Sequence, residues 1–296
     1  MNRADFINLT AGTVAAATLP QAPQVAGGTT YVVPFASAPY PHASRANGHV
    51  YEGKLFDAAT HYSNSDVGIF IPHGWHPRGG AIDFIVHFYG WRHDVAATFN
   101  TYRLREQLVK SGRNAILVVP QGPTNAPDSG DGKLELDAGG FKRFIGDVAA
   151  WIAQSNLSTT NRVGRIVLTA HSGGYGGAGG VLTRGGMNDA ITDVILFDSA
   201  YGYYDAFANW AKANPNNHFL SIFTDDTSTG NTALMGMLQQ PKPNLYVWLA
   251  DNMTLAQLQT RAPTFLLTTT VAHDELLQKF EWYALFLQST ALDATT

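Results

Sequence analysis

The chain has 296 residues, of which 45% are hydrophobic and 14% are charged, with a formal net charge of −4. The hydrophobic share is enough for a large core, and so few charges exclude a charged disordered tail or a coiled coil. The slightly acidic balance disfavours a nucleic-acid-binding surface. Cysteine is absent, which excludes disulfides, thiolate metal ligands and cysteine nucleophiles.

The N-terminal residues 1–26 resemble a bacterial export signal. Arg3 supplies a positive charge, residues 9–19 form a small and mildly apolar run, and the alanines after Pro20 suit a signal peptidase. A disordered, alanine-rich terminus is the alternative. We therefore expect a secreted or periplasmic protein in which residues 27–296 form one domain. The sequence has no run of about 20 apolar residues, so no integral membrane span is predicted.

Along the rest of the chain, β-rich apolar runs alternate with helix-like segments. Several of the runs are continuously apolar, which is typical of strands buried on both faces of a parallel sheet. The predicted strands are residues 67–72, 82–88, 115–120, 165–170, 193–197, 219–223 and 265–271.

The segments between these strands carry apolar residues at helical spacing. One stripe runs from Phe141 to Ile152, another from Phe99 to Val109 before Gly112, and a third marks a C-terminal helix over residues 276–287. This alternation predicts an α/β fold with a doubly wound, mostly parallel sheet and helices on both faces. Ligands of such sheets bind at the carboxyl ends of the strands, so residues just after each strand are the most informative.

A serine follows the fourth predicted strand in the sequence Ala170-His171-Ser172-Gly173-Gly174. A sharp strand-to-helix turn pushes a serine hydroxyl clear of the sheet, and it requires small residues two before and two after the serine. Ala170 and Gly174 meet that requirement, with alanine in place of the usual first glycine. The pattern predicts a nucleophile elbow at Ser172; a glycine-rich turn with an incidental serine is the alternative.

Serine is a poor nucleophile without a neighbouring base. Of the two histidines downstream of Ser172, His218 precedes a strand and so belongs to the wrong edge of the sheet. His273 follows the last predicted strand and opens the C-terminal helix, on the same edge as Ser172. We therefore expect His273 to be the general base.

The acid that orients this histidine should lie on the same edge, between the two in sequence. Asp198 ends the apolar run of the fifth strand, where a carboxylate is part-buried and fixed. Asp225 and Asp226 follow the next strand, within a polar segment that also suits a solvated turn. Asp198 is favoured, with Asp225 second, and the choice stays open at this point.

Acyl transfer also needs donors where negative charge develops on the carbonyl oxygen. The backbone N–H of Gly173, directly after the serine, is one candidate. The second is expected in the loop after residues 82–88, where Gly90 permits an unusual turn and either Trp91 or Tyr89 presents the N–H, with Trp91 favoured. Tyr89, Gly90 and His171 are grouped with them as substrate-binding residues.

Two further segments are expected near this edge. The loop over residues 128–137 connects a strand to a helix there, and its spacing does not match that of a calcium loop.

Several aromatic residues are equally compatible with a binding rim and with core packing, namely Trp75, Trp91, Tyr201, Tyr203 and Tyr204.

Two functions of other classes compete with catalysis by Ser172. Gly174–Gly179 matches G-x-G-x-x-G, and Asp198 lies where a ribose-binding acid would be, which predicts an NAD(P)-binding oxidoreductase. That alternative leaves His273 unexplained, and the motif does not follow the first strand. The other alternative is a catalytically inactive hydrolase fold that serves as a binding protein.

With these motifs in place, the chain resembles the α/β-hydrolase superfamily, and its A-H-S-x-G segment is similar to that of some bacterial lipases. The resemblance covers roughly residues 65–290 and implies a serine hydrolase of carboxylic esters that needs no cofactor. No metal site is expected from the sequence, and because no long insertion separates the fifth and sixth predicted strands, no large cap domain is expected either. A serine peptidase or a polyester depolymerase would use the same triad, so the expected substrate is a small-molecule or polymeric ester. Tyr89 departs from the family, many members of which have histidine there.

Overall fold

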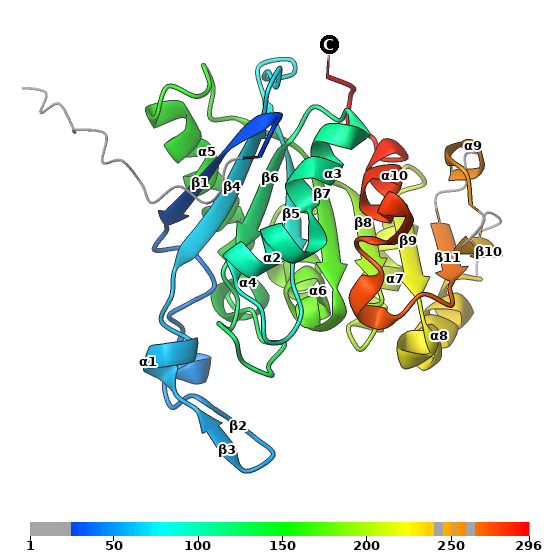
Figure 1. Ribbon diagram of the computed structural model, residues 1–296, viewed down its shortest axis with the longest axis horizontal. Helices are drawn as coiled ribbons and strands as arrows, with labels where there is room; N and C mark the ends of the chain where they lie inside the picture. The colour runs from blue at the N-terminus through cyan, green and yellow to red at the C-terminus, as the bar shows by residue number, and fades with distance from the viewer. Residues whose placement is uncertain (1–24, 240–244, 251–252, 259–263, 296) are drawn as a thin grey trace, which may run out of the picture.

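The computed structural model describes residues 25–239, 245–250, 253–258 and 264–295. Nine strands form one sheet in the order β1-β4-β6-β5-β7-β8-β9-β11-β10 (Figure 1). Only β4 runs against the others, because it pairs antiparallel with both β1 and β6. The strands of this sheet are β1 (Gly28–Pro34), β4 (Asp66–Pro72), β5 (Ile82–Phe88), β6 (Ile116–Pro120), β7 (Val163–His171), β8 (Ile191–Phe197), β9 (His218–Phe223), β10 (Leu245–Leu249) and β11 (Thr264–Thr268).

Each predicted strand overlaps a strand of this sheet, so the expected doubly wound, mostly parallel α/β architecture is confirmed. β1 and β10 were not predicted. β1 is an edge strand of mixed buried and half-buried residues, so it lacks a continuous apolar run. A separate two-stranded sheet, β2 (His49–Tyr51) and β3 (Lys54–Phe56), extends from the body of the molecule as a hairpin (Figure 1).

Helices cover both faces of the large sheet (Figure 1). On one face pack α2 (Val95–Tyr102), α3 (Leu104–Ser111) and α10 (Trp282–Gln288). The other face is covered by α5 (Gly140–Gln154), α6 (Tyr175–Arg184), α7 (Tyr204–Ala213) and α8 (Ser228–Leu238). The short helices are α1 (Ala58–His61), α4 (Gly132–Leu136) and α9 (Leu255–Leu258). The predicted stripe of α5 is fully buried against the sheet.

Two predicted helices are broken in the structure. The segment before Gly112 divides into α2 and α3 because Arg103 has φ +51°, which turns the chain and leaves Val109 39% exposed. The C-terminal helix does not start at His273, which opens a 3-10 turn, η5 (His273–Glu275). The α-helix begins only at Trp282, because Phe280 and Glu281 both have positive φ.

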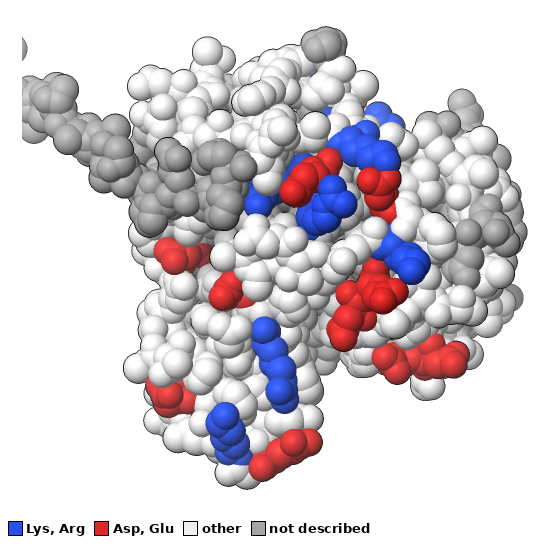
Figure 2. All heavy atoms as spheres, viewed as in Figure 1, with Lys and Arg blue, Asp and Glu red and all other residues white. Residues whose placement is uncertain are grey.

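The parallel strands all end at one edge of the sheet, which positions the site. Between β8 and β9 the chain forms α7 alone, so no cap domain is inserted there. None of the described helices is long and apolar enough to cross a bilayer. On the face seen in Figure 2, basic and acidic side chains lie intermixed. Lys110 of α3 forms an ion pair with Glu281.

Candidate active site

Ser172 lies at the carboxyl end of β7, in the 3-10 turn η2 (Ser172–Gly174) that leads into α6. Its φ is +51°, in the left-handed region that non-glycine residues seldom occupy. The turn also needs Gly174, since a Cβ there would lie 2.3 Å from the Phe88 carbonyl oxygen. This strained, crowded geometry places the serine at the end of the sheet, as a nucleophile elbow requires.

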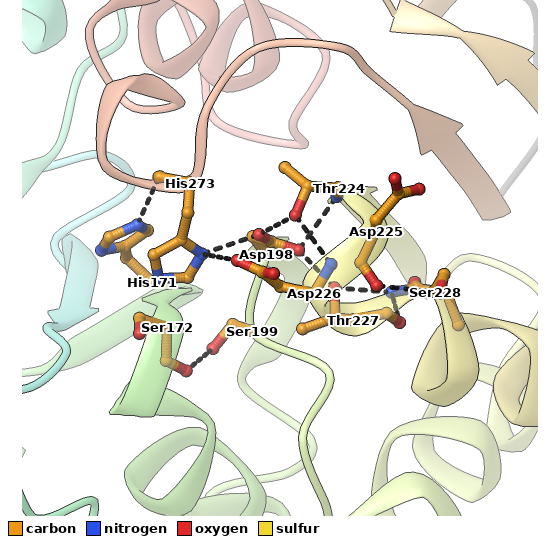
Figure 3. A network of polar contacts seen from close by, with 11 residues as sticks. His171, Ser172, Asp198, Ser199, Thr224, Asp225, Asp226, Thr227, Ser228 and His273 are labelled. Atoms are coloured by element: carbon orange, nitrogen blue, oxygen red, sulfur yellow. Dashed lines mark hydrogen bonds and ion pairs between the residues drawn. The ribbon is translucent and has the colours of Figure 1, made fainter.

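Asp198 and His273 form a hydrogen-bonded pair at the same edge (Figure 3). Asp198 directly follows β8 and is fully buried, and its Oδ2 lies 2.7 Å from His273 Nδ1. The carboxylate accepts three further hydrogen bonds, from the backbone N–H and hydroxyl of Thr224 (3.0 and 2.5 Å) and from the Thr227 hydroxyl. Asp198 is therefore held rigidly, and it leaves His273 Nε2 as the nitrogen able to exchange a proton.

The pair also sets the charge states of its members. Burial raises the pKa of Asp198, but its hydrogen bonds from His273, Thr224 and Thr227 outweigh burial and hold that pKa below the ordinary value. Burial lowers the pKa of His273. Asp198 and the nearby Asp274 and Asp226 raise it by more than burial lowers it, so the net shift is upward. An ionised acid next to a histidine of raised basicity is the arrangement that stabilises an imidazolium.

The second predicted acid, Asp225, lies elsewhere. It is exposed at the start of the 3-10 turn η3 (Asp225–Thr227), and its carboxylate points away from His273 (Figure 3). Its neighbour Asp226 is closer, with Oδ2 3.9 Å from His273 Nδ1, but its side chain is 62% exposed. Asp198 is thus the only one of the three with a direct and buried hydrogen bond to the histidine.

Ser172 and His273 share this edge, although no hydrogen bond joins the Ser172 hydroxyl to the His273 ring. Tyr201 connects the two, because it lines a cavity with Ser172 and lies edge-on to His273, with ring centroids 6.4 Å apart. Ser199, next to Asp198, donates from its hydroxyl to the Ser172 carbonyl oxygen at 2.7 Å. Nucleophile–base hydrogen bonds often form only once substrate binds, so the lack of one here does not argue against catalysis.

The loop after β5 passes directly beside the serine. A Cβ on Gly90 would lie 2.6 Å from Ser172 Cβ and 3.3 Å from the Gly173 backbone nitrogen, so only glycine fits. The next residue, Trp91, has a backbone N–H that makes no hydrogen bond to any residue the structure describes. Gly90 therefore lets this loop pack directly against Ser172 and the Gly173 backbone nitrogen, and Trp91 is the next residue of the loop.

A cavity of about 260 Å³ opens in front of Ser172 and is lined by Trp91, Ser129, Tyr175 and Tyr201 together with Gly173. The Trp91 indole N–H donates to the Ser129 hydroxyl at 2.7 Å, which fixes the ring over Gly173. Ser129 and Tyr175 were not predicted as site residues. Ser129 does belong to the loop over residues 128–137, which the sequence predicts at this edge. That position was the one sequence signal for Ser129.

The remaining predicted substrate-binding residues face inward. Tyr89 is 7% exposed, and its hydroxyl accepts a hydrogen bond from Gln121, which anchors the loop that carries Gly90. His171 is 2% exposed and lies under His273, with its Nε2 3.1 Å from the His273 carbonyl oxygen. In this structure both contact other protein residues rather than the cavity.

The glycines of Gly174–Gly179 are explained by packing. A Cβ on Gly177 would lie 2.4 Å from the Phe88 ring, and one on Gly179 would lie 2.3 Å from the Tyr203 ring. Asp198, the residue that the dinucleotide alternative assigns to a ribose, has four hydrogen bonds to protein groups. The packing of the protein therefore accounts for these glycines, and protein groups already bind the Asp198 carboxylate.

One group of described residues brings potential metal ligands together, with atoms of Asp198, Asp226 and His273 within 4.8 Å of one another. Because the Asp198 oxygens already accept bonds from hydroxyl and amide donors, this donor set does not fit a metal ion.

Comparison with known proteins agrees with this architecture. No protein-family model matches the chain, and no curated protein matches it. The feruloyl esterase module from Clostridium thermocellum, solved with sinapinate, has a TM-score of 0.55 at 11% identity, covering 88% of each chain. A ferulic acid esterase has a TM-score of 0.49 at 10% identity over 75% of this chain and 91% of its own. At such low identity the likeness establishes the fold: this chain has the α/β-hydrolase fold.

Proposed function

We propose that this protein is a serine hydrolase that cleaves carboxylic esters through Ser172, His273 and Asp198. The observation that carries the proposal is the 2.7 Å bond from His273 Nδ1 to buried Asp198, at the same sheet edge as a serine held at positive φ. The feruloyl esterase module that shares the fold supports the same chemistry.

In the proposed reaction, His273 Nε2 takes the Ser172 hydroxyl proton as Oγ attacks the ester carbonyl carbon. The negative charge moves to the carbonyl oxygen, where the Gly173 and Trp91 amides donate to it. Collapse of this intermediate breaks the bond to the alcohol oxygen, which receives the proton from His273. A water molecule, deprotonated by His273, then attacks the acyl-enzyme carbonyl carbon. Breakdown of the second intermediate breaks the bond to Ser172 Oγ, which takes the proton back from His273, and the acid is released.

Asp198 orients the ring and stabilises the imidazolium without itself taking the proton. Its four hydrogen bonds suit this role because they keep the carboxylate ionised and fixed throughout. The aromatic walls of Trp91, Tyr175 and Tyr201 favour an ester with an apolar group next to its carbonyl.

A fluorophosphonate probe, with mass spectrometry to locate the adduct, tests this proposal. We expect stoichiometric labelling at Ser172 that is abolished in Ser172→Ala and strongly slowed in His273→Ala. Hydrolysis of p-nitrophenyl acetate against a peptide panel then separates an esterase from a peptidase. A folded protein that stays unlabelled would remove the mechanism and leave the binding-protein alternative.

We further propose that residues 1–26 direct export, on the sequence evidence of Arg3 and the apolar run that follows it. Residues 1–24 of this segment lie outside the described residues. Expression of the full chain in a bacterial host, followed by fractionation and N-terminal sequencing, tests this. Recovery of the intact chain in the cytoplasm alone would contradict the proposal.

A further inference from the structure

His171 occupies an unusual place for a histidine next to a nucleophilic serine, because its ring turns away from the cavity. It is 2% exposed, and its ring lies against that of His273, with centroids 4.9 Å apart and an interplanar angle of 32°. His171 Nε2 lies 3.1 Å from the His273 carbonyl oxygen (Figure 3). A carbonyl oxygen can only accept, so Nε2 carries the proton and donates it.

This bond joins two elements that are distant in the sequence. His171 is the last residue of β7, next to Ser172, whereas His273 opens the turn η5 after β11. The bond therefore ties the main chain that carries His273 to the strand that carries Ser172. Asp198 fixes one ring nitrogen of His273, and His171 fixes its backbone, so together they constrain both ends of the side chain.

Further aromatic rings pack in series beyond the His171 ring. Tyr102, the last residue of α2, packs edge-on against it with centroids 5.1 Å apart. His93 stacks on Tyr102, and the Tyr102 hydroxyl lies 3.0 Å from His93 Nε2. A column of rings thus runs from His273 through His171 and Tyr102 to His93.

His171 also stays uncharged. Its pKa is lowered to about 3, first by burial and then by the nearby His273 and His93, against the smaller opposing effects of its bond to His273 and of Asp198. A charged ring at this distance would repel the imidazolium that forms on His273. A neutral histidine supplies the hydrogen-bond donor without that repulsion.

We propose that His171 is a positioning residue for the general base, which holds His273 at the distance from Ser172 that proton transfer requires. The inference rests on the proposed function, because it gives His171 a role only if His273 acts on Ser172. It replaces the substrate-binding role expected from sequence.

Two substitutions separate the donor from the ring. His171→Phe keeps a flat ring but removes the donor, whereas His171→Gln removes the ring but places an amide N–H near the former Nε2. We expect His171→Phe to lower kcat by at least about 10-fold with KM unchanged, because a small displacement of a catalytic group is costly. It should also move the acid limb of the kcat/KM profile to lower pH, as His273 loses its fixed contact with Asp198. His171→Gln should recover kcat to within about threefold of the parent.

His87→Phe is the matched control, since His87 is fully buried on β5 and bonds Thr169 Oγ1 at 2.9 Å rather than any part of the site. His87→Phe should lower the melting temperature about as much as His171→Phe does, but it should leave kcat and the pH profile unchanged. An unchanged kcat and profile in His171→Phe would overturn the inference, as would equal losses in the Phe and Gln variants. If the unsubstituted protein is not labelled at Ser172, the proposed function fails instead, so the two failures are distinguishable.

Discussion

The two ends of strand β8 carry two aspartate–histidine pairs that look alike and differ in what surrounds them. At the carboxyl end, Asp198 binds His273 at 2.7 Å; at the other end, Asp193 binds His218 at 3.0 Å. Both aspartates are fully buried, and both histidine side chains are partly exposed, at 21% and 13%. By the geometry of the pair alone, either could serve as the base and acid of a triad.

The difference lies in the neighbouring groups. Asp193 uses its second oxygen to bind the Thr192 hydroxyl at 2.6 Å and the Ala291 backbone N–H at 3.3 Å, so it ties the C-terminal residues to the sheet. Asp198 lies at the sheet edge that carries Ser172 and the Gly90 loop packed against it. Under the proposed function, an oriented histidine acts as a base only where the fold also places a nucleophile and oxyanion donors beside it.

Neutralising each aspartate in turn is the most direct test of whether the two pairs differ in function. Asp198→Asn should lower kcat by about 10⁴-fold, because the amide favours the wrong His273 tautomer and no longer stabilises the imidazolium. Asp193→Asn should leave kcat within about twofold and reduce the free energy of unfolding by about 1–3 kcal/mol, through weakened buried hydrogen bonds. Ester hydrolysis and urea denaturation of both variants measure this. Comparable losses of kcat in the two would show that the ends of β8 are not functionally distinct.

The close approach that distinguishes the Ser172 edge is tested by Gly90→Ala. The added methyl would lie 2.6 Å from Ser172 Cβ, so the loop must shift and carry the Trp91 amide away. We expect kcat to fall about 100-fold, the scale of losing one oxyanion donor, with a smaller change in KM. Gly146→Ala, in α5 with open space around it and, like Gly90, no positive φ, is the matched control for adding a methyl group. Full activity in Gly90→Ala would remove this loop from the oxyanion site.

The pH dependence of kcat/KM reports the His273–Asp198 pair directly. The raised pKa of His273 means that it is protonated, and inactive as a base, below a value higher than the ordinary 6.5. Activity should therefore fall as pH decreases through that raised pKa. In Asp198→Asn the largest attraction is lost while burial remains, so the acid limb of the residual activity should move to lower pH. A limb that stays in place would show that another group controls it.

The smallest effect is expected at Asp226. Its carboxylate is exposed and 3.9 Å from His273 Nδ1, a distance at which solvent and salt screen the attraction. Asp226→Asn should change kcat by less than about twofold and shift the acid limb slightly downward at low ionic strength. Adding about 0.5 M salt should remove even that shift. A loss approaching that of Asp198→Asn would instead give the orienting role to Asp226.

Much of the fold follows from local patterns in the sequence. The continuous apolar runs predict the buried strands of the sheet because strands covered on both faces have no polar side, as in Ile116–Pro120, which is buried throughout. The Ala170–Gly174 segment predicts the turn at Ser172 because steric crowding there admits only small residues. These features depend on neighbours in sequence, so a single chain reveals them.

What only the tertiary structure decided depends on contacts between distant segments. The choice of Asp198 over Asp225 is set by Thr224 and Thr227, which hold one carboxylate beside His273 while the other faces solvent. Likewise His171 ends its strand at the edge that carries the site, yet its ring lies under that of His273 because it packs on Tyr102 and bonds to the His273 carbonyl oxygen there. Sequence order places a residue at an edge of the sheet, but the direction of its side chain is fixed by partners that only folding brings together.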